Sequence, residues 1–317
     1  MSTILVTGAS GFTGAPVCRA LLDKGHRVIA AIRTGAVAPD GVETRHIGDI
    51  NGATDWSAAL DGIEAVVHLA GRAHIMRDTA EDPLAAFRAV NRDGTLNLAR
   101  QATNAGVKRL VFVSSVKVNG EERETGPYRE ATDGPPADPY GRSKYEAEEG
   151  LREIGAETGL EFVILRPPLI YGPGVKANFL ALLKLCRKGW PLPFGAVANR
   201  RSLLYVGNLA DAVAVSLDHP DAAGQTFLLR DGVDLSMAEL IRKLSSALGR
   251  NATLLPVPVF LLRSLAALAG RGDVMRRTTG SLTIDDGHIR SRLDWRPPYT
   301  VEQGLQATAD WFIASNP

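Results

Sequence analysis

The chain has 317 residues, of which 45% are hydrophobic and 22% charged, and its formal net charge is +1. This length allows one large domain or two joined domains, and the composition is that of a globular protein. A nearly neutral chain gives no electrostatic signal for nucleic acid as a partner. Cys18 and Cys186 lie among apolar residues and are expected to be reduced core thiols of a cytoplasmic protein.

A glycine-rich segment separates the first predicted strand, 3–6, from the first predicted helix, 15–24. Gly8 permits a tight turn, Gly11 lets backbone N–H groups approach a pyrophosphate, and Gly14 lets the helix pack closely on the strand. The pyrophosphate of a dinucleotide would lie at the helix N-terminus, where backbone N–H groups are unpaired. We therefore expect cofactor contacts from the whole turn, which includes Gly8, Ser10, Gly11, Phe12, Thr13 and Gly14.

The second predicted strand, 27–32, leads to Arg33 without an acidic residue. In NAD-binding proteins an Asp or Glu at this place accepts a hydrogen bond from the ribose 2′-hydroxyl. Arg33 would instead attract a 2′-phosphate, so the sequence favours NADP(H) over NAD(H), although an arginine stacked on adenine would give the same pattern. Asp49 and Ile50 follow the next predicted strand, 43–47, and are expected at the adenine edge.

Further strands are predicted at 65–69, 109–114 and 161–166, with helical segments between them. Such alternation indicates a parallel, doubly wound α/β sheet. Residues 82–105 are predicted to form one long helix, and a second begins at Tyr140. Their apolar stripes either pack on the sheet or pair with those of a second copy in a homodimer.

The strand at 65–69 contains one histidine and is followed by another. His68 lies in an apolar run, which is typical of a hydrogen-bonded core histidine. Leu69, Ala70 and Gly71 are small or apolar residues beside which a cofactor could pass. His74, on the following loop, is a candidate to face the substrate.

Tyr140 and Lys144 are four residues apart on a predicted helix, so their side chains share one face. A phenol titrates near ~10 and becomes a base near neutral pH only when a cation stabilises its phenolate. Ser115 follows a predicted strand at the edge where open α/β sheets bind ligands. A hydroxyl, a phenol and a lysine suit proton transfer at a carbinol or carbonyl oxygen while a hydride moves at the carbon. The Tyr-x-x-x-Lys spacing also occurs by chance, so its weight comes from the glycine turn upstream.

After residue 166 the chain changes to short elements rich in proline, glycine and basic residues. A helix is predicted from 178 to 186, and strands flanking a pocket at 190–195 and 199–206. Capping boxes at 236–239 and 300–303 predict two helix starts. The apolar segment 257–269 is too short to span a bilayer, and we expect a helix that packs on its own domain, with peripheral membrane contact as the alternative.

The motifs together resemble the extended short-chain dehydrogenase/reductase family, of the NAD-dependent epimerase/dehydratase type, over almost the whole chain. The matching segments are Gly8-x-x-Gly11-x-x-Gly14, Asp49-Ile50, His68-Leu69-Ala70-Gly71, Asn91-x-x-Gly94-Thr95, Ser114-Ser115, Tyr140-x-x-x-Lys144, Arg166-Pro167-Pro168, Tyr171-Gly172-Pro173-Gly174 and the strand from Arg201. The resemblance implies a Rossmann domain, 1–166, and a smaller C-terminal substrate-binding cap, 167–317, some segments of which return to the Rossmann domain.

The resemblance also implies roles for single residues. Ser115 and Tyr140 would hold the reacting oxygen, and Lys144 would bind the nicotinamide ribose and lower the pKa of Tyr140. Asn91 and Pro167 would lie on the cofactor side. The diphosphate of a UDP-sugar would be bound by Asn178, Arg201 and an arginine near 276, most directly Arg277.

Within the family, the segments after Ser115 and around Asn178 are most similar to a bacterial branch that acts at C4 of UDP-hexoses. The branch contains 4-keto reductases of the UDP-N-acetyl-quinovosamine dehydrogenase type and UDP-glucose 4-epimerase-like proteins. The missing acid before Arg33 favours reduction of a UDP-4-keto-6-deoxy-hexose, and a 4-epimerase with tightly bound NAD is the alternative. Dehydration is disfavoured because Val116-Lys117 stands where an acidic pair is needed. A non-catalytic NADP sensor would be expected to lack one of the three catalytic residues. The sequence shows no cluster of metal ligands.

Overall fold

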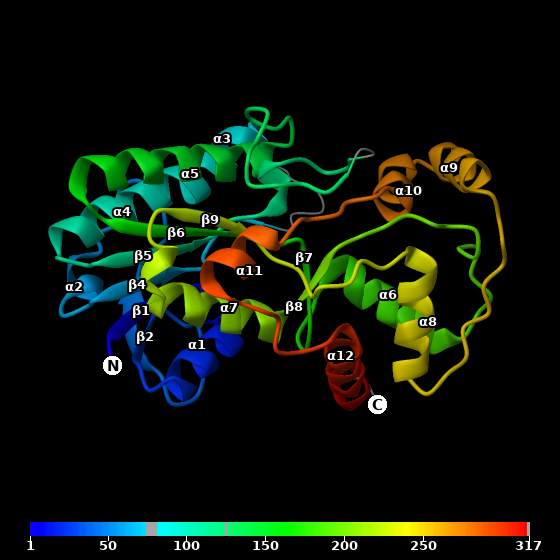
Figure 1. Ribbon diagram of the computed structural model, residues 1–317, viewed down its shortest axis with the longest axis horizontal. Coiled ribbons are helices and arrows are strands. Elements are labelled where there is room, and N and C mark those ends of the chain that lie inside the picture. Colours follow the sequence, from blue (N-terminus) through cyan, green and yellow to red (C-terminus); the bar gives the residue numbers. More distant parts are fainter. Residues whose placement is uncertain (74–80, 124–125, 316–317) are drawn as a thin grey trace.

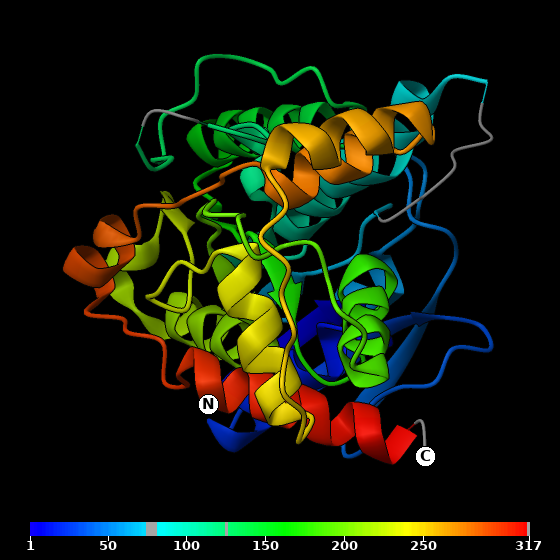
Figure 2. The same cartoon turned by 90° about the vertical axis from the view of Figure 1, so that its right-hand side faces the viewer.

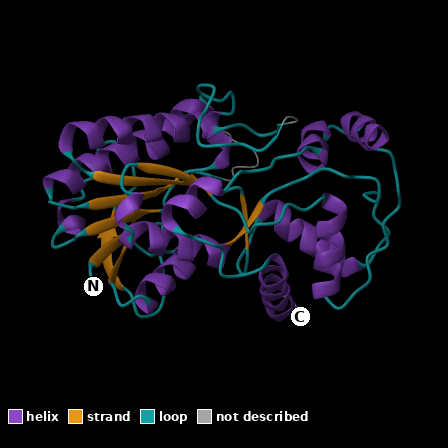
Figure 3. Cartoon of the chain, in the orientation of Figure 1, coloured by secondary structure: helices purple, strands orange, loops and turns teal. Residues whose placement is uncertain are grey.

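A computed structural model describes residues 1–73, 81–123 and 126–315, so His74 lies outside the described residues. Seven strands form one parallel sheet in the order β3-β2-β1-β4-β5-β6-β9 (Figures 1 and 3). The predicted α/β doubly wound sheet is therefore confirmed. The strands are β1 (Thr3–Thr7), β2 (Arg27–Arg33), β3 (Glu43–Ile47), β4 (Ala65–His68), β5 (Arg109–Val113), β6 (Glu161–Arg166) and β9 (Gln225–Leu228).

The strand order reverses between β1 and β4, which are neighbours in the sheet. Ligands of open α/β sheets bind beyond the carboxyl ends of the strands at such a reversal. Helices cover both faces of the sheet (Figure 1). On one face lie α2 (Ser57–Leu60), α3 (Pro83–Arg88), α4 (Thr95–Asn104) and α5 (Pro139–Thr158), and on the other α1 (Gly14–Asp23), α7 (Val206–Asp218) and α11 (Gly287–Leu293). Burial on both faces explains why the central strands are continuously apolar.

The remaining helices form a second region of the molecule, beside the carboxyl ends of the strands (Figures 1 and 2). They are α6 (Ala177–Lys188), α8 (Met237–Ala247), α9 (Val259–Leu268), α10 (Gly272–Thr279) and α12 (Val301–Ser315), with a two-stranded pair of β7 (Leu169–Tyr171) and β8 (Leu203–Tyr205). This part has its own core, in which Phe179, Leu183, Ile241 and Phe312 are buried. Three later elements, α7, β9 and α11, belong instead to the sheet and its helical cover.

Both predicted capping boxes are present. The Ser236 side chain accepts from the backbone N–H of Glu239 at 3.1 Å, while the Glu239 carboxylate accepts from the backbone N–H of Ser236 at 2.7 Å. Thr300 and Gln303 make the corresponding pair of bonds at 3.3 and 2.8 Å. Each box satisfies backbone donors at its helix start, which accounts for the positions at which α8 and α12 begin.

The long helix predicted over 82–105 is present as a continuous helical run from Pro83 to Asn104, but it is not regular throughout. The segment Ala89–Gly94 is π-helical and separates α3 from α4. A π-helical turn carries an extra residue and often marks a functional site. Here it contains Asn91, a predicted site residue.

The prediction of two strands flanking a pocket also needs correction. In 190–195 only Leu192 forms a bridge with another segment, because Pro191 and Pro193 have no N–H to donate. In 199–206 the strand is limited to β8, preceded by isolated bridges at Arg201.

Cys18 and Cys186 are buried free thiols, as expected. No helix in the described ranges combines the length and hydrophobicity that a bilayer span requires.

Candidate active site

The glycine turn has the geometry of a dinucleotide phosphate site. Gly8 has φ +70°, and its carbonyl accepts from Gly11 N–H at 2.9 Å. A Cβ on Gly14 would overlap the carbonyl oxygen of Ala9, so only glycine lets α1 pack this closely. Ser10 and Gly11 are exposed. The turn therefore presents accessible backbone at a helix N-terminus, which is the arrangement that holds a pyrophosphate.

Leu69, Ala70 and Gly71 connect this turn to the catalytic residues. A Cβ on Gly8 would lie 2.8 Å from Ala70 N, and a Cβ on Gly71 would lie 3.3 Å from Lys144 Nζ. Phe12, within the turn, faces the C-terminal part of the chain. A Cβ on Gly174 would lie 3.5 Å from its ring. Thr13 is half-buried as the residue before α1.

His68 is a core histidine, as predicted. Its Nδ1 lies 2.6 Å from Thr7 Oγ1 and its Nε2 lies 3.0 Å from Thr95 Oγ1. The ring is fully buried, and burial, together with the charge of Lys144, lowers its pKa to about 3. His68 is therefore neutral and braces β4 against β1.

Asn91 holds the chain after Gly71 against α5. Its Oδ1 accepts from Arg72 N–H at 2.8 Å, and its Nδ2 donates to Arg72 O at 3.1 Å and to Ser143 Oγ at 3.0 Å. The side chain is fully buried. Asn91 thus positions the strand end of β4 next to the helix that carries Tyr140.

Tyr140 lies in the first turn of α5. Asp138 caps this helix, because its carboxylate accepts from Gly141 N–H at 2.8 Å, and Pro139 occupies the first helical position. Burial raises the pKa of Tyr140 to about 12, a hydrogen bond with the Ser115 side chain opposes the rise, and the charge of Asp138 adds to it. Ser115 therefore lies near enough to the phenol of Tyr140 to favour its ionised form.

Lys144 is buried one turn further along α5. Its Nζ donates to Val113 O at 3.0 Å and lies 4.4 Å from the centroid of the Phe112 ring. Burial lowers the pKa of Lys144 to about 8, and the carboxylate of Glu148 opposes this shift. The pKa of Tyr140 is thus set by burial, Ser115 and Asp138, whereas the ammonium of Lys144 is bound at the end of β5.

Lys117 is a functional candidate to which the sequence reasoning gave no role. Its Nζ lies 5.9 Å from the centroid of the Tyr140 ring, 2.7 Å from Glu121 and 3.3 Å from Asp138. The three side chains line a cavity of about 450 Å³ together with Glu122, Arg276 and neighbouring backbone. The sequence contained one indication of a role for Lys117, namely that Val116-Lys117 stands where related dehydratases need an acidic pair.

Two of the three predicted diphosphate ligands are neighbours. Arg201 Nη1 donates to the carbonyl oxygens of Arg277 and Gly280 at 2.8 and 3.1 Å. Arg277 Nη2 lies 3.4 Å from Glu121 on the loop after β5. Asn178 is exposed in the first turn of α6, and no contact joins it to either arginine within the described ranges.

The remaining predicted cofactor residues lie around the strand ends. Arg33 Nη1 is 3.4 Å from Asp49 Oδ1, and both side chains are largely exposed, so the pair is weak. Ile50 is half-buried beside Asp49. Pro167 is buried, and its carbonyl accepts from Val116 N–H at 2.9 Å, which fixes the segment that follows Ser115.

A second groove, of about 490 Å³, lies on the outer surface of α4 and α5. Leu96, Tyr145 and several charged side chains line it, and Ser115, Tyr140 and Lys144 do not. It is larger than the cavity at Lys117, but it lacks the groups that proton transfer requires. We therefore place the chemistry at the carboxyl ends of β1, β4 and β5.

Comparison with known proteins identifies the family. Residues 4–229 match the model of the NAD dependent epimerase/dehydratase family. The chain belongs to this family and is therefore an NAD-dependent enzyme.

One curated relative is similar along the full length. The UDP-glucose 4-epimerase of Vibrio cholerae is 43% identical over 316 residues, which cover 99% of this chain and 96% of that protein.

Solved structures of two further epimerases have the same fold. The UDP-glucose 4-epimerase of Thermotoga maritima, solved with UDP-glucose, has a TM-score of 0.78 and 23% identity, and the match covers 99% of this chain and 100% of that one. The UDP-glucose 4-epimerase of Thermus thermophilus, solved as a complex with NAD, has a TM-score of 0.77 and 25% identity, with 99% of each chain covered.

Proposed function

We propose that the protein is a 4-epimerase of a UDP-hexose that works with bound NAD. The observation that carries the proposal is that Tyr140 and Lys144, on one face of α5, lie at the end of β5 beside Ser115 and next to the chain that contacts the glycine turn. Full-length similarity to a UDP-glucose 4-epimerase supports epimerisation over net reduction. The sequence alone favoured a 4-keto reductase. With the comparison, the 4-epimerase becomes the first candidate and the reductase the second.

The glycine turn and the strand ends fit a dinucleotide. Gly8 to Gly14 would hold the pyrophosphate, Asp49 and Ile50 would lie beside the adenosine, and Leu69 to Gly71 beside the nicotinamide ribose, near Lys144. NAD, when bound, supplies a reversible hydride acceptor and a positively charged ring near Tyr140.

Side chains of the protein would then transfer the proton and hold the sugar oxygen. Tyr140, as the phenolate, would accept the proton of the C4 hydroxyl, and Ser115 would donate a hydrogen bond to the same oxygen. After the 4-keto sugar has rotated in the site, Tyr140 would return the proton to the oxygen at C4. Because burial raises the pKa of Tyr140 to about 12, the nearby ammonium of Lys144 is needed to favour the phenolate when the site is filled.

We further propose that residues 167–317 bind the UDP part. Arg201 and Arg277 would contact the diphosphate, since guanidinium groups bind phosphate oxygens in pairs. Asn178 would approach it from α6. Glu121 lies 3.4 Å from Arg277 and would have to give up this contact to the substrate.

A UDP-4-keto-hexose reductase is the second candidate. The observation that favours it is Arg33 at the end of β2, without the acidic residue that usually accepts from the ribose. Arg33 would attract the 2′-phosphate of NADP(H). Against this, Arg33 lies beside Asp49, which reduces the positive charge available to a phosphate.

A redox balance separates the two candidates. The purified protein is incubated with a UDP-hexose, and the C4 epimers are followed by NMR while nicotinamide absorbance is recorded. Epimer interconversion without net change in absorbance supports the proposal. Stoichiometric consumption of NADPH with a UDP-4-keto-hexose, and no epimerisation, would establish the reductase instead.

The homodimer is also a proposal. The apolar and charged groove on α4 and α5 is a surface that a second copy could cover, with Leu96 and Tyr145 at the contact. Light scattering of the wild type and of a Leu96→Glu variant tests this. A dimer that becomes a monomer in the variant supports the assignment, and a wild-type monomer excludes it.

A further inference from the structure

Apolar side chains gather at one end of the molecule and lie open to solvent. Thirteen large hydrophobic residues are exposed in the described part of the chain, and six of them fall between 255 and 274. We call these six the apolar tip: Leu255, Phe260, Leu261, Leu265, Leu268 and Val274. Soluble proteins rarely expose a large apolar patch unless it binds something.

Five of the six residues of the apolar tip belong to the hairpin of α9 and α10, and Leu255 precedes it. Of the apolar residues of α9 only Leu262 is buried, whereas Phe260 is 67%, Leu265 63% and Leu268 87% exposed. The expected helix in segment 257–269 is present and packs on α10 through Leu262, but most of its apolar side chains stay exposed. The hairpin is held from its other side, where Arg263 donates to Thr279 Oγ1 at 2.9 Å.

The stretch that carries most of the apolar tip is mainly basic. No Asp or Glu occurs from Leu240 to Gly272, and this stretch contains five basic residues. Arg271, between α9 and α10, is exposed and forms no ion pair with any described residue. Two acidic residues lie beside the hairpin and are paired with its arginines: Asp273 is 3.6 Å from Arg276, and Glu122 is 3.7 Å from Arg263.

A second basic and aromatic group adjoins the tip. Lys188 Nζ lies 4.5 Å from the ring of Trp190, which is 60% exposed. The backbone of Leu192 pairs with Thr253 and Leu255, so this group joins the tip at Leu255. Tryptophan with lysine at the edge of an apolar patch is typical of surfaces that lie at a membrane interface.

We propose that the apolar tip docks on an anionic phospholipid surface, with Phe260, Leu265 and Leu268 in the acyl boundary and Arg271 at the headgroups. α9 is too short to cross a bilayer, so the contact is peripheral. A second copy of the chain fits less well, because it would bring basic residues against basic residues, whereas anionic headgroups complement them.

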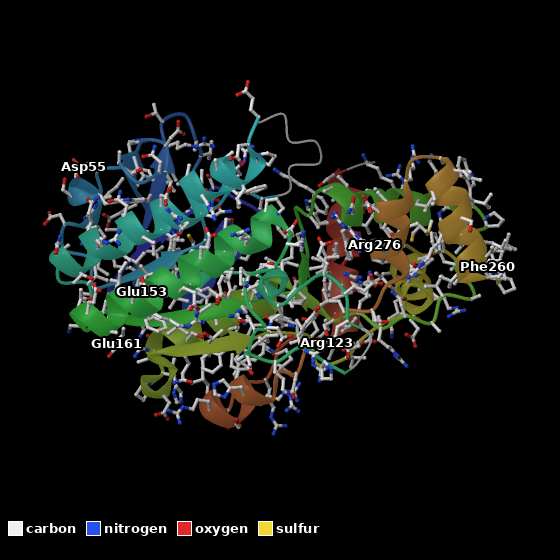
Figure 4. The ribbon with its side chains drawn as sticks, turned by 90° about the horizontal axis from the view of Figure 1, so that it is seen from above. Asp55, Arg123, Glu153, Glu161, Phe260 and Arg276 are labelled. Carbon is white, nitrogen blue, oxygen red and sulfur yellow. The ribbon has the colours of Figure 1, made fainter. Side chains whose placement is uncertain are left out.

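The position of the tip agrees with this contact. Figures 1 and 2 show the hairpin at the end of the molecule away from the sheet, and Figure 4 shows Phe260 at the outer extreme with Arg276 further in. Arg276 lies 3.9 Å from Glu122, on the loop after β5. Docking would therefore leave the strand ends and the cofactor turn clear of the membrane.

Vesicle sedimentation tests the proposal with the full chain. The wild type is expected to bind phosphatidylcholine vesicles that contain phosphatidylglycerol, to bind pure phosphatidylcholine less, and to be released by salt. The triple variant Phe260→Glu, Leu265→Glu, Leu268→Glu should lose about tenfold or more in the partition coefficient. Arg271→Glu should lose part of the binding and part of its salt dependence.

Controls separate docking from misfolding and from self-association. Ile313→Glu changes another exposed apolar residue, on α12, and should bind vesicles as the wild type does. Circular dichroism and turnover of a water-soluble UDP-hexose should be unchanged in the triple variant. The proposal is overturned if the wild type ignores anionic vesicles, if the triple variant binds them equally, or if the wild type is a dimer that the triple variant dissociates.

Discussion

At the scale of single residues, the site is a phenol held at high pKa beside a lysine held at low pKa. Burial is the first cause of both shifts, since it disfavours the phenolate of Tyr140 and the ammonium of Lys144 alike. The hydroxyl of Ser115 is the group that favours the phenolate directly. Both shifts disfavour the charged forms, so the phenolate that the proposed reaction needs would have to be stabilised when the cofactor is bound.

Removal of the phenol tests the assigned role. Tyr140→Phe should lower the turnover number by about 10²- to 10⁴-fold, the usual contribution of a positioned acid–base group. NAD content and the unfolding transition should change little, because the ring stays. Tyr145→Phe, on the same helix but in the outer groove, is the matched control. Unchanged turnover in Tyr140→Phe would remove Tyr140 from the mechanism and reopen the non-catalytic NADP sensor.

The buried Lys144 makes stability depend on pH. Its pKa falls from 10.5 to about 8 in the folded chain, so between pH 8 and 10 the unfolded state binds more protons. Stability must then rise with pH over this window, by about 1.4 kcal/mol per unit for this one group. Above pH 10 the raised pKa of Tyr140 acts in the opposite direction, because the unfolded phenol ionises first.

The difference between the wild type and Lys144→Met isolates this contribution. Urea unfolding at pH 8, 9 and 10 should show a gain of about 2 to 3 kcal/mol for the wild type relative to the variant. Parallel pH dependences of the two proteins would mean that Lys144 is not buried as a cation.

At the scale of elements, α5 is fixed to the sheet by a buried ion pair. Glu148 and Arg166 are fully buried, with Arg166 Nη2 2.5 Å from Glu148 Oε2, and Glu148 also accepts from Ser114 Oγ at 2.5 Å. The pair joins the helix of Tyr140 to the ends of β5 and β6. Glu148 lies one turn after Lys144, and its partner Ser114 precedes Ser115, so the pair holds α5 and the end of β5 together beside the catalytic groups.

Loss of one partner would leave the other charge buried alone. Glu148→Gln should cost about 3 kcal/mol of unfolding free energy, because Arg166 would lose its counter-charge. Glu149→Gln, whose side chain is 48% exposed, should change stability by less than about 0.5 kcal/mol. Equal effects of the two substitutions in urea unfolding would contradict the importance of burial here.

Local elements were predictable from the sequence, and contacts between distant segments were not. The glycine turn, both capping boxes and the Tyr140–Lys144 spacing follow from residues a few positions apart. The Glu148–Arg166 pair and the Glu121–Arg277 contact depend on where the elements pack. The same reason explains the failures: the π-helical segment and the exposed α9 are set by packing rather than by local pattern.

At the scale of the whole molecule, the sheet and the C-terminal part meet through charged side chains around the site. Glu121, after β5, lies 2.7 Å from Lys117 and 3.4 Å from Arg277. Burial raises the pKa of Glu121, but hydrogen bonding to Lys117 and the charges of Arg277 and Arg276 outweigh this and lower it overall. A substrate diphosphate would take over Arg277 and so couple binding to the position of the C-terminal part.

Arg277→Ala should raise KM for the UDP-sugar by about tenfold or more, with a smaller effect on kcat, since a charged hydrogen bond contributes about 1.5 to 3 kcal/mol. Steady-state kinetics with a UDP-hexose measures both constants. Arg292→Ala, exposed on α11, is the control and should leave KM unchanged. A fall in kcat at constant KM would place Arg277 in the chemistry rather than in diphosphate binding.

The central claim is that hydride leaves C4 of the sugar and returns to the same carbon while Tyr140 handles the proton. A UDP-hexose deuterated at C4 tests it directly, with the purified protein in ordinary water and NMR or mass analysis of the product. We expect C4-epimerised product that retains its deuterium at C4. Epimerised product with hydrogen from solvent at C4, or no epimerisation at all, would contradict it.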